Sequence, residues 1–292
     1  MTKSIVSTEI CSSAKRVGEE KAIELIAKAG FDAWDFSMMS NVVNFDWDTR
    51  ESSFLNHPLN GSGCLRFARK LKKISDDNGI FCNQSHAPFP IFDSKIKDYI
   101  KKSLELTAVV GGKICVIHPD TNKSLAENAE IFSELLPFAK LMGIKIATEN
   151  MWDWDFDNNI AKKTICSTHN DFSSLLKMVN DDYLVACVDI GHAEMRGLDT
   201  SAVQMIESLK SKVCALHIHD NDKFKDLHGL PFTNKINFNE VIIALNKVGY
   251  SGAFTLECDA WLIAQPDLEI GLKTMESRVR EMANYFDNIK AR

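Results

Sequence analysis

The chain has 292 residues, of which 45% are hydrophobic and 25% charged, the balance of a folded globular protein rather than a disordered one. A formal net charge of −6 and a pI near 5.8 argue against a broad nucleic-acid surface, which usually needs a domain pI above about 9. No run approaches the roughly 18 apolar residues of a membrane span, and the start, MTKSIVSTEI, lacks a signal-peptide core. We therefore expect a cytoplasmic protein without membrane contact.

Short apolar runs alternate with amphipathic segments along the chain. The runs predict strands over residues 5–10, 33–36, 80–84, 114–117, 144–148, 184–189, 213–218 and 253–256. Apolar positions three and four residues apart predict helices over 17–29, 63–77, 94–110, 125–141, 171–179, from about 201, 238–248 and 266–289. Two long loops, 37–62 and 151–168, remain, and the first is long enough for a functional lid. Eight strands alternating with eight helices predict an α/β fold, a single-domain (β/α)₈ TIM barrel over residues 1–292.

Ionisable side chains follow six of the predicted strands. In a (β/α)₈ barrel the catalytic groups lie at the carboxyl ends of the strands, so these residues are expected to share one mouth. They are His86 (SHAPF), His118 (VIHPD), Glu149 (ATEN), Asp189 and His192 (VDIGH), His217 (LHIHD) and Glu257 (TLEC), with Asp226 and His228 in the loop KDLHG. His219 shares a strand face with His217 and could be a ligand in its place, but we expect it to support that residue. His57 and His169 are expected in solvent.

Three carboxylates at one mouth predict a metal site. Glu149, Asp189 and Glu257 would repel one another strongly without a cation. Carboxylates and imidazoles without cysteine suit Mn²⁺, Zn²⁺, Co²⁺ or Mg²⁺. The eight cysteines are spread out without a C-x-x-C pair, and a cysteine next to a ligand, such as Cys258, points to the opposite strand face. We expect buried thiols rather than ligands or disulfides.

Nearly the whole chain resembles the xylose isomerase-like barrels in the order of its short motifs, which are HAP, HP, EN, D-x-x-H, H-x-x-D, D-x-H and LE. This superfamily holds sugar isomerases, epimerases and inosose-processing enzymes as well as endonuclease IV. The resemblance to the sugar enzymes implies one divalent ion held by Glu149, Asp189, His217 and Glu257. The full set is also similar to the trinuclear zinc site of endonuclease IV, which implies possible additional ligands at His86, His118, His192, Asp226 and His228.

The loops at the active face favour a small sugar-like substrate over nucleic acid. Acidic residues, among them Asp46, Asp48, Asp153 and Asp155, would oppose a phosphate backbone. The tryptophans of the same loops suit an apolar wall against a sugar ring, and we expect Trp152 to contact substrate. Ketose 3-epimerases carry an arginine six residues after the strand-seven histidine, where this chain has Lys223.

The function expected from the resemblance is a metal-dependent isomerase or epimerase of a sugar, keto-sugar or related polyol. The catalytic residues would be Glu149 and Glu257, which exchange a proton with the substrate through a metal-stabilised enediolate, and His192, which hydrogen-bonds a substrate oxygen. His86, His118, Trp152, Lys223 and His228 are the expected substrate contacts.

Three alternatives stay open. An inosose dehydratase-like lyase could use the same groups to remove water, and an endonuclease IV-like phosphodiesterase would cut DNA at abasic sites. A sugar-binding barrel without activity is the third. A homo-oligomer is compatible with each of these functions.

Overall fold

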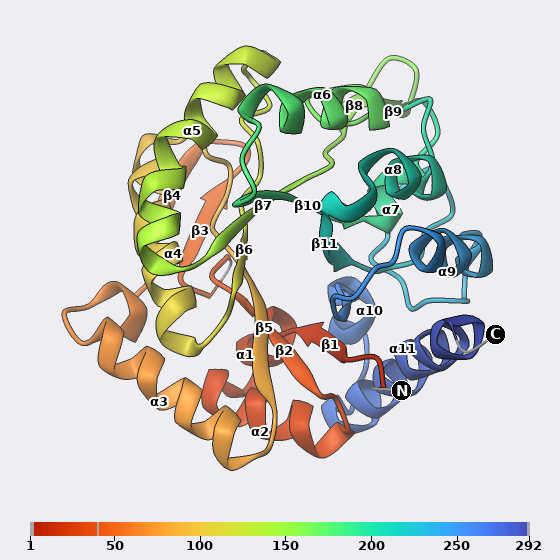
Figure 1. Ribbon diagram of the computed structural model, residues 1–292. Coiled ribbons are helices and arrows are strands. Elements are labelled where there is room, and N and C mark those ends of the chain that lie inside the picture. The colour runs from red at the N-terminus through yellow and green to blue at the C-terminus, as the bar shows by residue number, and fades with distance from the viewer. Residues whose placement is uncertain (1–2, 40, 291–292) are drawn as a thin grey trace.

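The computed structural model describes residues 3–39 and 41–290, with a sheet of eight parallel strands at its centre (Figure 1). The strands are β1 (Val6–Glu9), β2 (Ala33–Ser37), β5 (Phe81–His86), β6 (Ile114–Val116), β7 (Lys145–Glu149), β10 (Leu184–Asp189), β11 (Val213–His217) and β12 (Phe254–Leu256). Their order is β11-β10-β7-β6-β5-β2-β1-β12. Ile218 joins the two ends, because its N–H donates to the Thr255 carbonyl at 2.9 Å and its carbonyl accepts from the Glu257 N–H at 3.0 Å. The predicted (β/α)₈ barrel is thereby confirmed.

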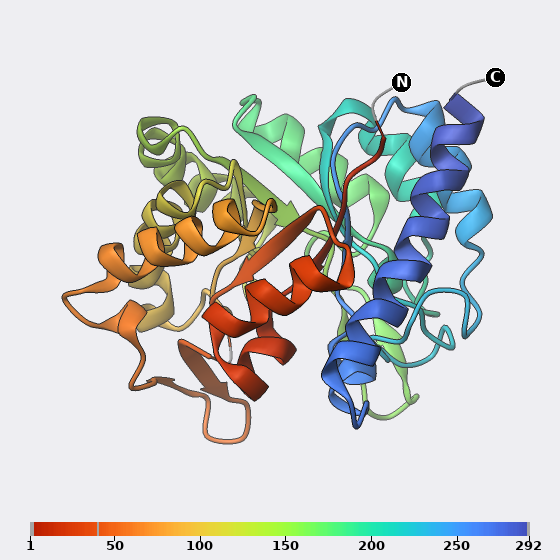
Figure 2. The same cartoon turned by 90° about the horizontal axis from the view of Figure 1, so that it is seen from below.

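Helices surround the barrel on its outside (Figures 1 and 2). The longer ones are α2 (Glu19–Ala29), α3 (Cys64–Asp77), α4 (Ser94–Val110), α5 (Leu125–Met142), α6 (His169–Val179), α8 (Ala202–Leu209), α9 (Phe238–Lys247) and α11 (Leu268–Lys290). Shorter helical segments are α1 (Cys11–Val17), α7 (Ile190–Ala193), α10 (Asp259–Ile263) and the 3₁₀ turns η1 (Pro58–Asn60) and η2 (Lys210–Lys212). Within the described ranges, no helix has both the length and the apolar character that crossing a bilayer requires.

The first helical region differs from its prediction. The pattern predicts one helix over 17–29, whereas the chain forms α1 and α2, separated at Gly18 with φ 78°. The buried face of α1 consists of small residues, Cys11, Ser12, Ser13 and Ala14. Small side chains give no apolar periodicity, so the sequence pattern does not reveal this helix.

Each of the two predicted long loops contains an antiparallel hairpin. The first pairs β3 (Val43–Asp46) with β4 (Glu51–Phe54), and the second pairs β8 (Asp153–Asp155) with β9 (Ile160–Lys162). They follow β2 and β7, so they rise from the carboxyl ends of barrel strands. Figure 2 shows the first hairpin at the end of the barrel away from the labelled termini. Both hairpins therefore belong to the mouth.

A small apolar cluster lies inside the barrel below the mouth. It consists of Val116, Ala147, Val185, Cys187 and Ala215, on four neighbouring strands. Ala147, Cys187 and Ala215 each lie two positions before an ionisable residue that ends the same strand. Side chains two apart on a strand share a face. This cluster is therefore the apolar floor under the ionisable strand ends.

Candidate metal centre

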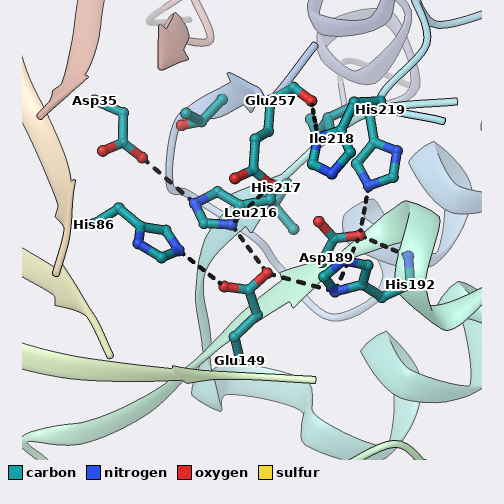
Figure 3. Close-up of polar contacts among 12 residues, drawn as sticks. Asp35, His86, Glu149, Asp189, His192, Leu216, His217, Ile218, His219 and Glu257 are labelled. Atoms are coloured by element: carbon teal, nitrogen blue, oxygen red, sulfur yellow. Dashed lines mark hydrogen bonds and ion pairs between the residues drawn. The ribbon is translucent and has the colours of Figure 1, made fainter. Parts of the chain in front are cut away.

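Four side chains converge at the centre of the mouth (Figure 3). Glu149 ends β7, Asp189 ends β10, His217 ends β11, and Glu257 follows β12. Nδ1 of His217 lies 3.1 Å from Oε1 of Glu149 and 3.5 Å from Oε2 of Glu257. Each of the four residues offers one ligand atom, and these atoms all lie within 4.8 Å of one another. The structure thus brings together the residues predicted as the main metal ligands.

Two more predicted histidines reach Glu149 from the next strands. Nε2 of His118 lies 3.2 Å from Oε2 of Glu149, and Nε2 of His86 lies 3.6 Å from the same oxygen. The two Nε2 atoms are only 3.0 Å apart. Burial lowers the pKa of His118 to about 4 despite the carboxylate, so this imidazole is neutral at pH 7. Together the three residues form a second possible metal position.

A third group lies beside the first and contains His192, His219, Asp226 and His228. Oδ2 of Asp226 is 3.2 Å from Nε2 of both His192 and His228, and its Oδ1 is 3.4 Å from Nε2 of His219. Burial acts to lower the pKa of His192, but nearby carboxylates, Asp189 first, raise it to about 10. His219, expected either to support His217 or to be a ligand in its place, lies with its ring within ligand distance of this third group.

The approach of His219 depends on the turn after β10. The expected tight turn at Gly191 is the short helix α7, in which the His192 N–H donates to Oδ1 of Asp189 at 2.7 Å. A Cβ atom at Gly191 would lie 1.9 Å from Cε1 of the His219 ring. Only glycine leaves room for the imidazole there. The motif VDIGH therefore supplies a carboxylate, an imidazole and the space for a second imidazole.

Asp35 is a residue that sequence analysis missed. It lies in β2, fully buried, and its Oδ2 is 3.5 Å from Nε2 of His217 and accepts a hydrogen bond from Gln84 at 2.8 Å. The opposite ring nitrogen of His217 faces the carboxylates of the centre. A metal-binding histidine usually has such a partner on its second nitrogen, which fixes the orientation of the ring. A charged residue inside the apolar run AWDF was the signal available in the sequence.

The electrostatic environment shifts the pKa values of Glu149 and Glu257 in opposite directions. Burial acts to raise the pKa of Glu149, but the neighbouring imidazoles, His217 first, hold it well below its ordinary value. For Glu257 burial prevails and the pKa is raised. Such opposite tendencies are typical of paired acids and bases. Cys187 lies near Glu149 and His217, and burial raises the pKa of its thiol, as expected for a buried cysteine.

The donor atoms fit a divalent cation. Oδ2 of Asp189 and Nδ1 of His219 are buried and have no hydrogen-bond partner among the described residues, and Oε2 of Glu149 makes only ion-pair contacts with imidazoles. Buried polar atoms without partners cost free energy unless a ligand satisfies them. Imidazole nitrogens with carboxylate oxygens are the donors of Mn²⁺, Zn²⁺ and Co²⁺ sites, and carboxylates also bind Mg²⁺.

A cleft of about 510 Å³ opens above these groups. Its floor is lined by ionisable side chains, namely His86, His118, Glu149, His192, Asp226, His228 and Glu257. Its walls carry aromatic side chains, namely Trp47, Phe89, Trp152, Trp154 and Phe156. Lys223, a predicted substrate contact, is not among the described residues that line the cleft, since its Nζ pairs with Oε2 of Glu194 at 2.8 Å. The other predicted substrate contacts all face it.

Comparison with known proteins identifies the family of this chain. The chain is 27% identical over 171 residues to an uncharacterized protein of Methanocaldococcus jannaschii, a match that spans 56% of this chain and 55% of that protein. Solved structures of an L-ribulose 3-epimerase (14% identity, TM-score 0.72) and of the IolI protein with a zinc atom (16%, 0.73) each match 97% or more of both chains, which shows a shared fold. Residues 23–281 match the family described as xylose isomerase-like TIM barrel. The chain belongs to the xylose isomerase-like TIM barrel family.

Proposed function

We propose that the protein is a divalent-metal-dependent isomerase or epimerase of a sugar, keto-sugar or related polyol. The observation that carries the proposal is the position of Glu149 and Glu257, which reach the His217 ring from strands β7 and β12, with β10 and β11 between them. Both carboxyl groups meet at Nδ1 of this ring, so a substrate carbon bound there would be within reach of both. The family and the solved 3-epimerase support activity on a sugar.

Glu149, Asp189, His217 and Glu257 are the proposed ligands of the main cation. When bound, the cation supplies Lewis-acid polarisation of a substrate carbonyl, which contributes several kcal/mol. The solved IolI protein is described with zinc, and the donor set here also suits Mn²⁺, Co²⁺ or Mg²⁺. The groups that contain His86 with His118, and His192 with Asp226 and His228, are proposed as possible further positions.

The two glutamates are proposed to move the proton. One carboxylate takes it from the carbon next to the carbonyl, and the other carboxyl group returns a proton to that carbon, a contribution of about 10²–10⁴-fold for each group. In the metal-free site the pKa of Glu149 is lowered and that of Glu257 is raised, so the environments of the two carboxyl groups differ. His192 is proposed to hydrogen-bond a substrate oxygen, and His86, His118, His228 and Trp152 to orient the substrate.

The test is hydrogen exchange in deuterated water. Ketohexoses, ketopentoses and inososes are incubated with metal-loaded protein, and deuterium next to the carbonyl is followed by NMR. At least one of them should take up deuterium, and chelator should stop the uptake. No exchange in any of these sugars would contradict the proposal. Loss of water from an inosose would instead identify the lyase alternative.

The complete set of three donor groups favours one second candidate, a phosphodiesterase similar to endonuclease IV. Acidic residues of the two hairpins, including Asp46, Asp48, Asp153 and Asp155, oppose a DNA backbone and rank this candidate lower. Elemental analysis separates the two, because one bound ion per chain is expected of the sugar enzyme and three of the nuclease. Cleavage of abasic-site DNA that His228→Ala abolishes would reverse the ranking.

A further inference from the structure

The cleft has an apolar part that proton transfer does not use. Trp152 and Trp154 lie on the side of the β8–β9 hairpin, with ring centroids 6.1 Å apart at 80°. Both pack against a separate small cluster of Ala161, Met195 and Leu198, while each ring also lines the cleft. The two indoles are thus supported from behind by their own apolar core. Such support gives a rigid aromatic surface with little conformational entropy to lose on binding.

The rim of the cleft adds two exposed rings. Phe156 is 86% exposed and Trp47 is 60% exposed, although both are large and apolar. They belong to different hairpins yet line the same cleft. Trp47 is held edge-on against Phe45 at 4.9 Å. Exposed aromatic groups that gather around a cleft are typical of a ligand-binding site.

The charges around this apolar part disfavour an anionic ligand. None of the described residues that line the cleft is a lysine or an arginine, and the His192 imidazole there pairs with Asp226 at 3.2 Å. Two nearby lysines are engaged elsewhere, Lys162 with Asp153 at 3.1 Å and Lys223 with Glu194 at 2.8 Å. Recognition of phosphate or carboxylate normally depends on such cations. Away from the floor, an anionic group would meet aromatic rings and the carboxylate of Asp153.

We infer that this aromatic part of the cleft binds an uncharged apolar substituent of the substrate, such as an aryl or alkyl aglycone. The volume of about 510 Å³ lies within the range of about 300–1,000 Å³ typical of pockets that enclose drug-sized ligands, so a ring beyond one sugar has room. The inference rests on the proposed function and specifies its substrate class: a neutral glycoside rather than a sugar phosphate. Because a glycosidic bond blocks the anomeric carbon, the carbonyl must lie at another ring carbon.

The test compares three ligands that differ in one group. The phenyl and methyl glycosides of one ring-oxidised hexose, and the 6-phosphate of that methyl glycoside, are titrated into metal-loaded protein by calorimetry. The phenyl glycoside should bind at least about tenfold more tightly than the methyl glycoside, because its ring leaves water for the aromatic walls. The phosphate should bind no more tightly than the methyl glycoside.

Variants at the rim test whether the preference for the phenyl glycoside comes from the exposed aromatic rings. Phe156→Ala and Trp47→Ala should each reduce the phenyl-to-methyl affinity ratio, and the double variant should bring it to within about threefold of unity. Tyr285→Ala on α11 removes an aromatic ring that is 38% exposed and does not line the cleft, so it should leave the ratio unchanged. Circular dichroism of each variant checks the fold.

Three results would overturn the inference. Equal affinity for the two glycosides excludes an apolar subsite, and tighter binding of the phosphate excludes a neutral substrate class. If free keto-sugars still exchange hydrogen, the proposed function stands without the inference. A phenyl preference that survives in the double rim variant excludes the location. Failure of the proposed function has a different signature, namely the absence of hydrogen exchange in every keto-sugar and glycoside.

Discussion

The barrel mouth and the outer helices place charge in opposite environments. On α3, Lys72 pairs with Asp76 at 2.7 Å and Lys73 with Asp77 at 2.6 Å, and these side chains are 44–72% exposed. In the mouth, the side chain of Glu149 is only 1% exposed. Exposed helix pairs contribute about 0.3–0.5 kcal/mol each, whereas buried charges are costly unless they are paired or bind a ligand.

This difference separates residues that serve the fold from residues that serve a ligand. The outer charges follow local rules, as in α5, where Ser124 and Glu127 form a reciprocal cap within one turn. The charges of the mouth come from strands far apart in the sequence and meet only after the barrel closes. Substitutions in the mouth should therefore change binding and chemistry, and substitutions on the outer helices should change stability slightly.

The largest effect is expected from Glu257→Gln. The amide keeps the shape of the side chain but cannot exchange a proton, so deuterium uptake by a keto-sugar substrate should fall by about 10²–10⁴-fold. Because the change also removes an anionic ligand of the proposed cation, metal affinity should fall as well, and uptake is therefore compared at saturating metal. Uptake within tenfold of the unchanged protein would remove Glu257 from the proton-transfer role.

The second-largest effect is expected from Asp189→Asn, which removes an anionic ligand of the proposed cation. The amide oxygen can still accept the hydrogen bond from the His192 N–H, so the turn and the fold should persist. Metal affinity should fall by more than the roughly 10–100-fold typical of an outer partner. Equilibrium dialysis with elemental analysis measures the affinity, and circular dichroism the fold. Full occupancy in the variant would rule out the proposed centre.

Asp35→Asn tests a residue that acts through His217. Because it removes the carboxylate behind the ring without touching the cation, metal affinity should fall by about 10–100-fold. Ser7→Ala is the matched control, since the Ser7 hydroxyl donates to Oδ1 of Asn83 at 2.6 Å, and Asn83 is linked through Gln84 to Asp35. A fall of equal size in both variants would indicate a general loss of packing instead.

Metal binding should also depend on pH. Burial acts to lower the pKa of His217, but the carboxylates of Glu257 and Glu149 help to raise it well above its ordinary value, so the metal-free ring holds its proton to higher pH than an ordinary imidazole. A cation needs the neutral ring, so binding releases a proton, and affinity should rise by up to about tenfold per pH unit below the raised pKa. Calorimetry in buffers of different ionisation enthalpy counts the protons. Binding without proton release would contradict this protonation state.

The smallest effect is expected on the outer helices. Lys73→Ala removes one exposed pair of α3 and should lower the free energy of unfolding by no more than about 0.5 kcal/mol, with metal affinity unchanged. Chemical denaturation and dialysis measure the two quantities. A change in metal affinity would erase the distinction between the two regions.

The sequence by itself determined the alternation of strands and helices and the residues at the strand ends. Both are local signals, because a strand shows as a short apolar run and the residue after it lies at the mouth of any such barrel. Glu149, Asp189, His217 and Glu257 could be identified in this way before their neighbours were known.

Only the tertiary structure decided how deeply each ionisable side chain is buried and which groups it contacts. Asp35 faces His217 because β2 and β11 lie across one barrel, and His219 reaches Asp226 because Gly191 leaves space. His57, expected in solvent, is mostly buried and lies 3.0 Å from Glu19. Lys223 pairs with Glu194 instead of facing the cleft. Glu9 ends β1, and burial raises the pKa of its carboxyl group, but the sequence pattern did not single it out. These contacts depend on strand register and on loops from distant parts of the chain, which no local pattern encodes.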